Sequence, residues 1–350
     1  MSYNKFIAII LVILLLSLTY WYVLKEKNDN NNNDNKNHTE MNKTSKNVNS
    51  IAFDNNTVWI GIHHTARTIT EDSPAIIFLD GGIKKYDLKT KKWENYTTND
   101  KKEFFSIEEI VIDDNDVWIG TFKYGIIRYN KISDKWSVYD IENGLIDLDI
   151  RSMAVSNGVL WVGTLYGLNK FNINSNTWEN YTLGEGRNNQ ISALIMDDNY
   201  LWIGTQWGLK RFNLSNEKWI NYTTQNGLVG NGIECLTNRN DLIFIGTNYN
   251  GLSIYNKNNN SWKSFNESNG LINNWVVSIV INKNYLWIGT RNGLSRYDMS
   301  TNNFKNYNVE DGLIYNDIQS LAIYKNELWI GTMDGLCTFN TITENWTYYF

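Results

Sequence analysis

The 350-residue sequence contains a single proline, Pro74, and only two cysteines, Cys235 and Cys337. The two cysteines lie far apart along the chain, so we expect two small buried thiols and no disulfide. No Cys-x-x-Cys pair and no cluster of cysteines and histidines occurs, which argues against a structural zinc site. Aromatic residues, which favour strands, make up 14% of the chain, so the composition favours β structure.

Basic clusters and enzyme motifs are also missing. The net charge is −5 and no stripe of lysines and arginines is present, so nucleic acid is not an expected partner. The sequence has no Gly-x-Ser-x-Gly, His-Glu-x-x-His, phosphate-loop or dinucleotide-binding motif. Of the three histidines, His38 lies in a polar N-terminal stretch, and His63 and His64 are adjacent. These absences favour a non-catalytic protein without a cofactor.

One long hydrophobic run follows the short tail of residues 1–5. Residues 6–24 form an uncharged stretch of 19 residues, and a helix of that length spans about 28 Å, close to the hydrocarbon thickness of a bilayer. The aromatic residues Tyr20, Trp21 and Tyr22 at its outer end suit the membrane interface. A cleavable signal peptide is the alternative, but this end offers no small-residue cleavage site. We therefore expect an uncleaved transmembrane signal anchor.

Residues 25–47 are polar, rich in asparagine and nearly free of apolar side chains. Such a segment cannot bury enough surface to order itself, so we expect a disordered tether. Lysines flank the hydrophobic run on both sides and leave its orientation open. Because an N-terminal anchor followed by one large domain is typical of export, we expect the domain to lie outside the cytoplasm.

A repeat fills the rest of the chain. The tetrad Trp-Ile-Gly-Thr, or a close variant, recurs at spacings of 59, 43, 41, 42, 43 and 42 residues. The first spacing is long because about 17 extra residues follow Gly61. The aromatic residue of the tetrad is in turn Trp59, Trp118, Trp161, Trp202, Phe244, Trp287 and Trp329.

Each unit consists of four short segments separated by turn residues. In the third unit these are residues 150–155, 160–164, 167–171 and a segment that contains Trp178 and Tyr181. This pattern predicts a four-stranded antiparallel meander. Seven such units predict an all-β, seven-bladed β-propeller over residues 48–350, with an insertion at 63–81 in blade one.

The alternation within the tetrad explains why such a blade needs neighbours. In residues 201–205, Leu and Ile face one side of the sheet while Trp and Gly face the other, so both faces are non-polar. The glycine leaves room for a large side chain of the adjacent blade. A buried indole contributes roughly 4–6 kcal/mol of transfer free energy. Because the chain starts in an inner strand and ends in an outer one, we expect ring closure by face packing between blades one and seven, without a swapped strand.

The string LWIGT…GL.RYD…F..Y…DGL, from Leu286 to Leu313, resembles the two-component regulator propeller repeat, and the likeness covers about 300 of the 350 residues. The resemblance implies an extracytoplasmic sensor propeller of a prokaryotic signalling protein, a class often linked to polysaccharide fragments. Three features depart from the family: Phe244 replaces Trp, repeat one carries the insertion, and no kinase segment follows Phe350. We therefore expect a separate membrane signalling protein as the partner.

The insertion and the Asp-rich turns are candidate metal or catalytic sites. The adjacent histidines of the insertion, with acids nearby, could bind a metal or act as acid and base. The alternative is a decorated loop or an extra hairpin that caps the central opening. Residues 113–116 (Asp-Asp-Asn-Asp) could suggest calcium, but Asp and Asn are ordinary turn formers at this place in a meander.

The loops that follow the tetrads should meet on the same face as the insertion. Exposed aromatic rings with a few charges suit an oligosaccharide or a peptide ligand, although these rings could also simply cover strand ends. The alternatives in function are a protein-docking scaffold or adhesion module, and a lyase-type propeller enzyme that uses a histidine of the insertion. The predicted ligand-binding residues are His63, His64, Tyr124, Tyr166, Trp207, Tyr249, Arg291 and Asp334.

Overall fold

The computed structural model describes residues 46–63, 65–70, 73–79, 82–96, 106–184 and 189–350. The expected anchor at 6–24 and nearly all of the expected tether lie outside these residues. Within the described ranges, no helix is both long enough and apolar enough to cross a bilayer.

The described chain folds into seven four-stranded antiparallel sheets, which confirms the predicted seven-bladed propeller. Blade one consists of β1 (Asn47–Asp54), β2 (Thr57–His63), β5 (Gly82–Asp87) and β6 (Trp93–Tyr96). Blade two consists of β7 (Ile107–Ile112), β8 (Asp116–Thr121), β9 (Ile126–Asn130) and β10 (Lys135–Tyr139). Blade three consists of β11 (Ile150–Ser156), β12 (Val159–Thr164), β13 (Leu168–Asn172) and β14 (Thr177–Tyr181).

The remaining four blades repeat this order. Blade four consists of β15 (Ile191–Asp197), β16 (Tyr200–Thr205), β17 (Gly208–Asn213) and β18 (Trp219–Tyr222). Blade five consists of β19 (Ile233–Arg239), β20 (Leu242–Thr247), β21 (Leu252–Asn256) and β22 (Ser261–Phe265). Blade six consists of β23 (Val276–Asn282), β24 (Tyr285–Thr290), β25 (Gly293–Asp298) and β26 (Asn303–Tyr307). Blade seven consists of β27 (Ile318–Tyr324), β28 (Glu327–Thr332), β29 (Gly335–Asn340) and β30 (Trp346–Tyr348).

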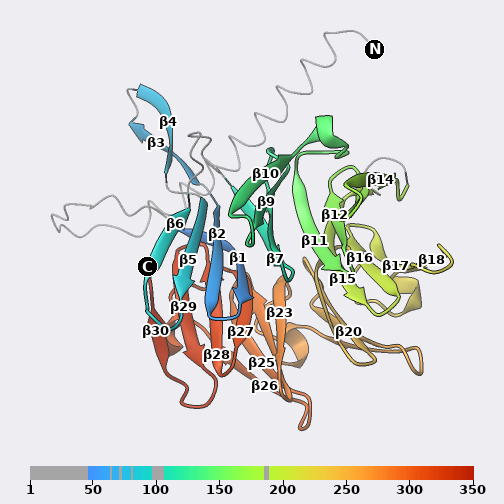
Figure 1. Cartoon of the computed structure of the whole chain (residues 1–350). Coiled ribbons are helices and arrows are strands. Elements are labelled where there is room, and N and C mark those ends of the chain that lie inside the picture. Colours follow the sequence, from blue (N-terminus) through green and yellow to red (C-terminus); the bar gives the residue numbers. More distant parts are fainter. Residues whose placement is uncertain (1–45, 64, 71–72, 80–81, 97–105, 185–188) are drawn as a thin grey trace. The chain divides into compact units, whose positions relative to one another are not determined.

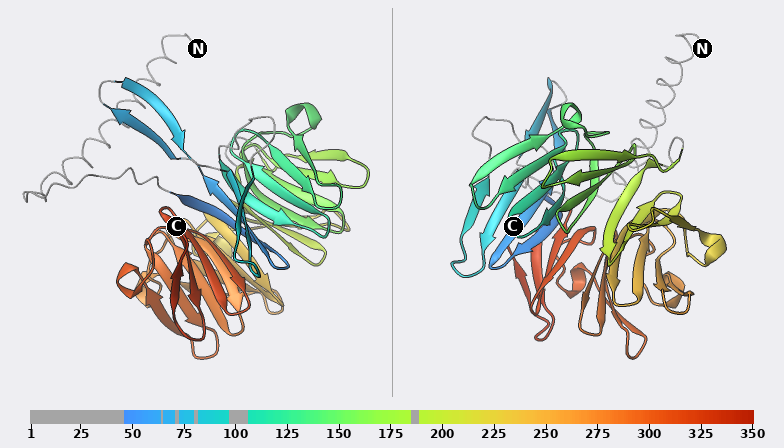
Figure 2. Two further views of the ribbon diagram at one scale, coloured as in Figure 1. Left: turned by 60° about the vertical axis from the view of Figure 1, so that its left-hand side comes forward. Right: turned by 45° about the vertical axis from the view of Figure 1, so that its right-hand side comes forward.

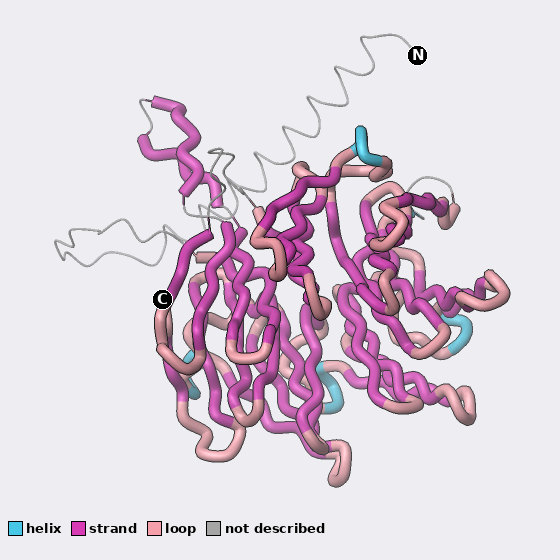
Figure 3. Tube along the Cα trace, in the orientation of Figure 1, coloured by secondary structure: helices cyan, strands magenta, loops and turns pink. Residues whose placement is uncertain are grey.

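Turn residues set the boundaries of these strands. In blade three, Asn157 and Gly158 both have positive φ, 51° and 72°, as a tight hairpin turn between β11 and β12 requires. Within the described residues, four blades are linked to the next blade by a short 3-10 helix, drawn in cyan in Figure 3: η1 (Ile141–Asn143), η3 (Thr224–Asn226), η4 (Glu267–Asn269) and η5 (Val309–Asp311). Each of these helices carries a capping box and ends at a glycine in the left-handed region.

The tetrad glycines allow neighbouring blades to pack closely. A Cβ atom added at Gly163 would lie 2.4 Å from Cγ2 of Ile191, at the start of the next inner strand, and Gly61 stands in the same relation to Ile107. The large side chain that the glycine accommodates is therefore a β-branched residue of the following blade. The tetrad indoles of Trp118 and Trp202 are fully buried, so both faces of a central blade are covered.

The ring closes between the first and last blades, and β1 packs against β27 and β28 (Figure 1). The Oγ atom of Ser320 donates a hydrogen bond to the carbonyl oxygen of Val48 at 2.8 Å. The rings of Phe53 and Tyr324 stack with centroids 5.2 Å apart. Each of these two blades is built from its own end of the chain, with no exchanged strand, so the expected closure by face packing is confirmed.

The insertion in blade one forms an extra hairpin between β2 and β5. Its strands β3 (Thr65–Thr70) and β4 (Ser73–Leu79) pair with each other in a separate two-stranded sheet. In Figures 1 and 2 the hairpin extends away from the blades. The backbone therefore agrees with the interpretation of the insertion as an extra hairpin.

Candidate functional site

Each inner strand carries a β-bulge at the same place. Pairing between the first two strands of a blade skips one residue, for example Asn49 in β1 and Glu108 in β7. A bulge turns a side chain out of the regular ladder. The seven skipped residues are Asn49, Glu108, Arg151, Ser192, Glu234, Val277 and Gln319.

These seven bulge residues all line the same central channel. It comprises an inner cavity of about 240 Å³ and a wider mouth of about 550 Å³, and every bulge residue borders both. Six of the seven are polar or charged, although the strands that carry them are otherwise largely apolar. The propeller therefore gathers one side chain from each blade around a polar opening, and we treat this channel as the candidate site.

The mouth lies at the end of the blades that carries the tetrad loops, which is the predicted face. Besides the bulge residues it is lined by Asn47, His63, Gln190, Ile191, Gln206, Arg291 and Met333. His63 and Arg291 were among the predicted ligand-binding residues, so the structure brings these two together around the opening. His64 lies outside the described residues.

The other predicted residues occupy tight turns around the mouth rather than its lining. In blade three the Oγ1 atom of Thr164 donates to the carbonyl oxygen of Gly167 and accepts the backbone N–H of Tyr166 at 3.1 Å. The same threonine-centred turn holds Trp207 and Asp334. The exposed aromatic side chains of this group are Tyr124, Tyr166, Trp207 and Tyr249, which are 50%, 64%, 55% and 64% exposed. The linings of the two cavities do not include them. Tyr249 packs on Trp275, with ring centroids 4.8 Å apart, next to the mouth residue Arg291.

Two basic side chains at the mouth, His63 and Arg151, each lie next to a carboxylate. Nε2 of His63 lies 3.4 Å from Oε1 of Glu108. Burial raises the pKa of Glu108, an effect that the nearby His63 opposes. Arg151 pairs with Asp149 at 3.0 Å, which gives this guanidinium a carboxylate of its own.

A second arginine, Arg291 of blade six, is likewise paired, whereas Glu234 of the adjacent blade five forms no ion pair within the described residues. Nη1 of Arg291 lies 3.0 Å from Oδ1 of Asp317, and its guanidinium stacks 5.1 Å from the ring centre of Trp275. Burial raises the pKa of Glu234, an effect that the charge of Arg291, the side chain of Trp275 and the charge of Arg151 oppose. In the part of the chain that the structure describes, no basic side chain lies within the 4.0 Å of an ion pair from Glu234.

Glu109, next to the bulge of blade two, borders the inner cavity. Its position corresponds to Ser152 in blade three, whose Oγ accepts the backbone N–H of Leu194 in the next blade at 2.9 Å. The carboxylate of Glu109 does the same for the backbone N–H of Met153. Burial raises the pKa of Glu109 to about 7.

Sequence reasoning missed Glu108, Arg151 and Glu234 as site residues. The signal was present, because the second residue of most first segments is polar in an otherwise apolar run. Only an alignment of the repeats at that position would have revealed it.

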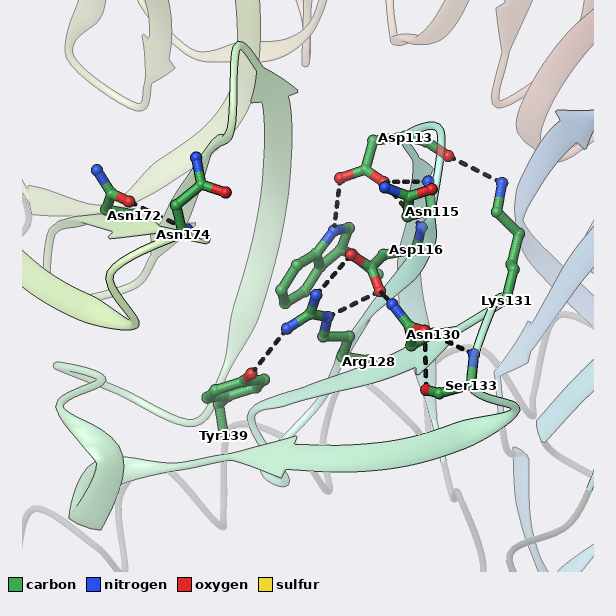
Figure 4. Close-up of polar contacts among 11 residues, drawn as sticks. Asp113, Asn115, Asp116, Arg128, Asn130, Lys131, Ser133, Tyr139, Asn172 and Asn174 are labelled. Atoms are coloured by element: carbon green, nitrogen blue, oxygen red, sulfur yellow. Dashed lines mark hydrogen bonds and ion pairs between the residues drawn. The ribbon is translucent and has the colours of Figure 1, made fainter.

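The Asp-rich turn of blade two is a structural feature (Figure 4). Oδ1 of Asp113 accepts the backbone N–H groups of Asn115 and Asp116 at 3.0 and 2.8 Å, which confirms the interpretation as a turn. The buried carboxylate of Asp116 pairs with Arg128 at 2.7 Å and also accepts from Asn130. Across the described ranges, no group of three or more His, Cys, Asp and Glu side chains is arranged to hold a metal ion.

The two cysteines are free, as expected. Cys337 is fully buried and Cys235 is half-buried. Burial raises the pKa of the Cys337 thiol to about 12 and that of Cys235 further. Both thiols therefore stay protonated and act as small apolar side chains.

No family model and no curated protein matches the chain. Solved structures with a similar fold do match it. The extracellular domain of BT4673 from B. thetaiotaomicron, described as a hybrid two-component system, superposes with a TM-score of 0.67 at 22% identity over 85% of this chain. The corresponding domain of BT3049 superposes with a TM-score of 0.66 at 21% sequence identity over 86% of this chain. PorZ of the Porphyromonas gingivalis type-IX secretion system superposes with a TM-score of 0.60 at 10% sequence identity over 87% of this chain.

This chain spans only about two fifths of the length of those solved chains, 38%, 41% and 38%. At such identities the likeness concerns the fold. Extracellular domains of two-component systems are nevertheless among its structural neighbours, in agreement with the resemblance of its repeats. The chain therefore has the seven-bladed propeller fold found in extracellular domains of hybrid two-component systems.

Proposed function

We propose that the chain is a non-catalytic sensor propeller that binds a small polar ligand at the mouth of its central channel. The observation that carries this proposal is the ring of seven bulge residues, one from each blade, around a polar opening of about 550 Å³. A small number of polar groups converging on a concave site is typical of ligand recognition. The extracellular domains among the structural neighbours support a sensing role and a place outside the cytoplasm.

The proposal extends to the membrane and to a partner. Residues 6–24 would hold the propeller at the membrane, and residues 25–47 would act as a tether. Binding at the mouth would then be passed to a separate membrane signalling protein. An oligosaccharide fits this proposal because amide, carboxylate, guanidinium and hydroxyl groups line the opening.

The pair formed by His63 and Glu108 favours a second candidate, a lyase-type enzyme. A histidine 3.4 Å from a carboxylate at the mouth of a cavity has the arrangement of a general base. The substitution His63→Ala separates the two candidates. A lyase would lose its turnover, whereas a sensor would show altered binding and no reaction to lose.

The proposed function is tested with the full chain in detergent. Thermal unfolding is followed in the presence of neutral oligosaccharides, amines, peptides and divalent ions. A ligand that binds the folded state should raise the unfolding temperature in a saturable way. The variant Gln319→Ala changes the mouth, and the variant Asp114→Asn changes an exposed acid on the β7–β8 turn. Loss of the response in the first variant alone would support the channel, while no response to any compound would overturn small-ligand sensing and favour a docking scaffold.

A further inference from the structure

We infer that the group bound in the channel is a protonated primary amine, held by the carboxylates of Glu108 and Glu234. This inference rests on the proposed function, because it names the chemical class of ligand for the same site. It is carried by the distribution of charge and by hydrogen-bond acceptors at the mouth that have no donor.

The charged groups that border the channel do not balance one another. They are His63, Glu108, Glu109, Arg151, Glu234 and Arg291. Both arginines already pair with carboxylates outside the lining, those of Asp149 and Asp317. The remaining groups of this set are three glutamates, Glu108, Glu109 and Glu234, and one histidine, His63. The channel therefore favours a cation.

Glu234 belongs to this lining and, within the described residues, has no basic side chain at ion-pair distance, although Arg291 and Arg151 act on it from further away. Its carboxylate is half-buried on the bulge of β19 and borders both the inner cavity and the mouth. Among the residues that the structure describes, it forms no ion pair. A partly buried carboxylate is stabilised by a cation that also donates hydrogen bonds.

An independent observation concerns the amide side chains of the first blade. Asn47 is only 8% exposed, and its Oδ1 atom accepts no hydrogen bond within the described ranges. The residue borders the mouth, and its Oδ1 atom is buried there without a donor among the described residues. Oδ1 of Asn49, on the bulge of the same strand, is in the same state. A buried acceptor without a donor costs about 1–3 kcal/mol, so the site gains from a ligand that donates.

These observations select an ammonium group over the alternatives. An ammonium offers three donors and one positive charge, and it accepts nothing. A neutral polyol would satisfy the amide oxygens but would leave Glu234 without a countercharge. A metal ion would require a set of ligands, and the described chain shows no group of three suitable side chains.

The dimensions of the channel further restrict the ligand. The inner cavity has a volume of about 240 Å³ and the mouth about 550 Å³. Glu234 borders both spaces, so the ammonium must belong to a molecule small enough to fit within them. An alkyl amine or an amino group on a small polar molecule meets this requirement.

The test compares 1,5-diaminopentane with 1,5-pentanediol, which has the same length but no charge, on the full chain in detergent. Sodium chloride at matched ionic strength controls for screening. The diamine should raise the unfolding temperature by roughly 5 °C at a hundredfold excess over its Kd, while the diol and the salt should not. The variant Glu234→Gln should lose this response by at least tenfold in Kd, and Asp114→Asn should keep it. Glu108→Gln, which removes the other proposed carboxylate, should also weaken the diamine response. Circular dichroism of each variant shows whether a lost response reflects a lost site or a lost fold.

The outcomes distinguish this inference from the proposed function. Equal stabilisation by the diol and the diamine would overturn the amine, as would an unchanged diamine response in folded Glu234→Gln. A neutral oligosaccharide that binds where the diamine does not would refute the inference and leave the sensor proposal standing. If no small compound binds at all, both fail.

Discussion

At the scale of single residues, Glu109 shows how one position of the repeat can serve two purposes. In three other blades a serine at this position accepts a backbone N–H of the next blade, as Ser50 does for Ile110 at 2.9 Å. Glu109 keeps that contact with Met153 and adds an ionisable group beside the inner cavity. Because burial disfavours the ionised carboxylate, its pKa rises to about 7.

This raised pKa predicts a pH-dependent stability. An unfolded glutamate titrates near 4.5, so between pH 4.5 and 7 the folded chain holds a proton that the unfolded chain has released. The contribution of Glu109 to stability is therefore present below pH 4.5 and is lost as the pH rises towards 7. We expect wild type to lose about 2–3 kcal/mol more than Glu109→Gln over this interval, measured by denaturant unfolding. Parallel pH profiles for the two proteins would contradict the prediction.

At the scale of the element, a blade is a sheet with two apolar faces that must meet the faces of its neighbours. The tetrad glycine sets how closely they approach, because its missing side chain is replaced by an Ile or Val of the next inner strand. The bulge in that strand then turns the following residue into the channel. A packing residue and a site residue are thus neighbours in the sequence. Ile191 packs against Gly163 at the interface between the blades, and Ser192, the next residue, lines the opening.

The substitution Gly163→Ala tests this packing. An alanine Cβ would lie 2.4 Å from Cγ2 and 3.0 Å from Cβ of Ile191, so we expect a loss of about 2–3 kcal/mol of unfolding free energy. Ile191→Ala, combined with Gly163→Ala, should recover part of this loss, because removal of the isoleucine makes room. The free energies of the two single variants and the double variant give the coupling. Additive losses would show that these two residues do not share the interface.

At the scale of the whole molecule, stability depends on a seam between the two ends of the chain. The seam is an aromatic cluster from blades one and seven. Tyr349 stacks on Trp329 with centroids 5.0 Å apart and meets Tyr86 of blade one at 5.5 Å. Among the strands that the structure describes, none is exchanged between these two blades, so side-chain packing at this seam helps to keep the ring closed.

Tyr349→Ala should therefore destabilise the whole propeller. The loss of an aromatic ring from such a cluster costs about 3 kcal/mol, and we expect a single cooperative transition at a lower temperature in calorimetry. Tyr348→Ala is the matched control, because the neighbouring ring is 55% exposed and should change stability by less than about 1 kcal/mol. Equal effects of the two substitutions would show that the seam does not depend on the aromatic cluster.

The sequence by itself determined the number of blades, the four strands in each, the role of the tetrad and the manner of closure. These follow from local alternation and from a repeat that cannot bury both faces alone. Only the tertiary structure decided where the site lies. Successive bulge residues are between 41 and 59 positions apart in the chain and meet only because the ring closes. The exposed aromatic residues Tyr166 and Trp207 were identified because rings in loops stand out in a sequence, whereas Glu108 and Glu234 look like ordinary strand residues until seven strands converge around one axis.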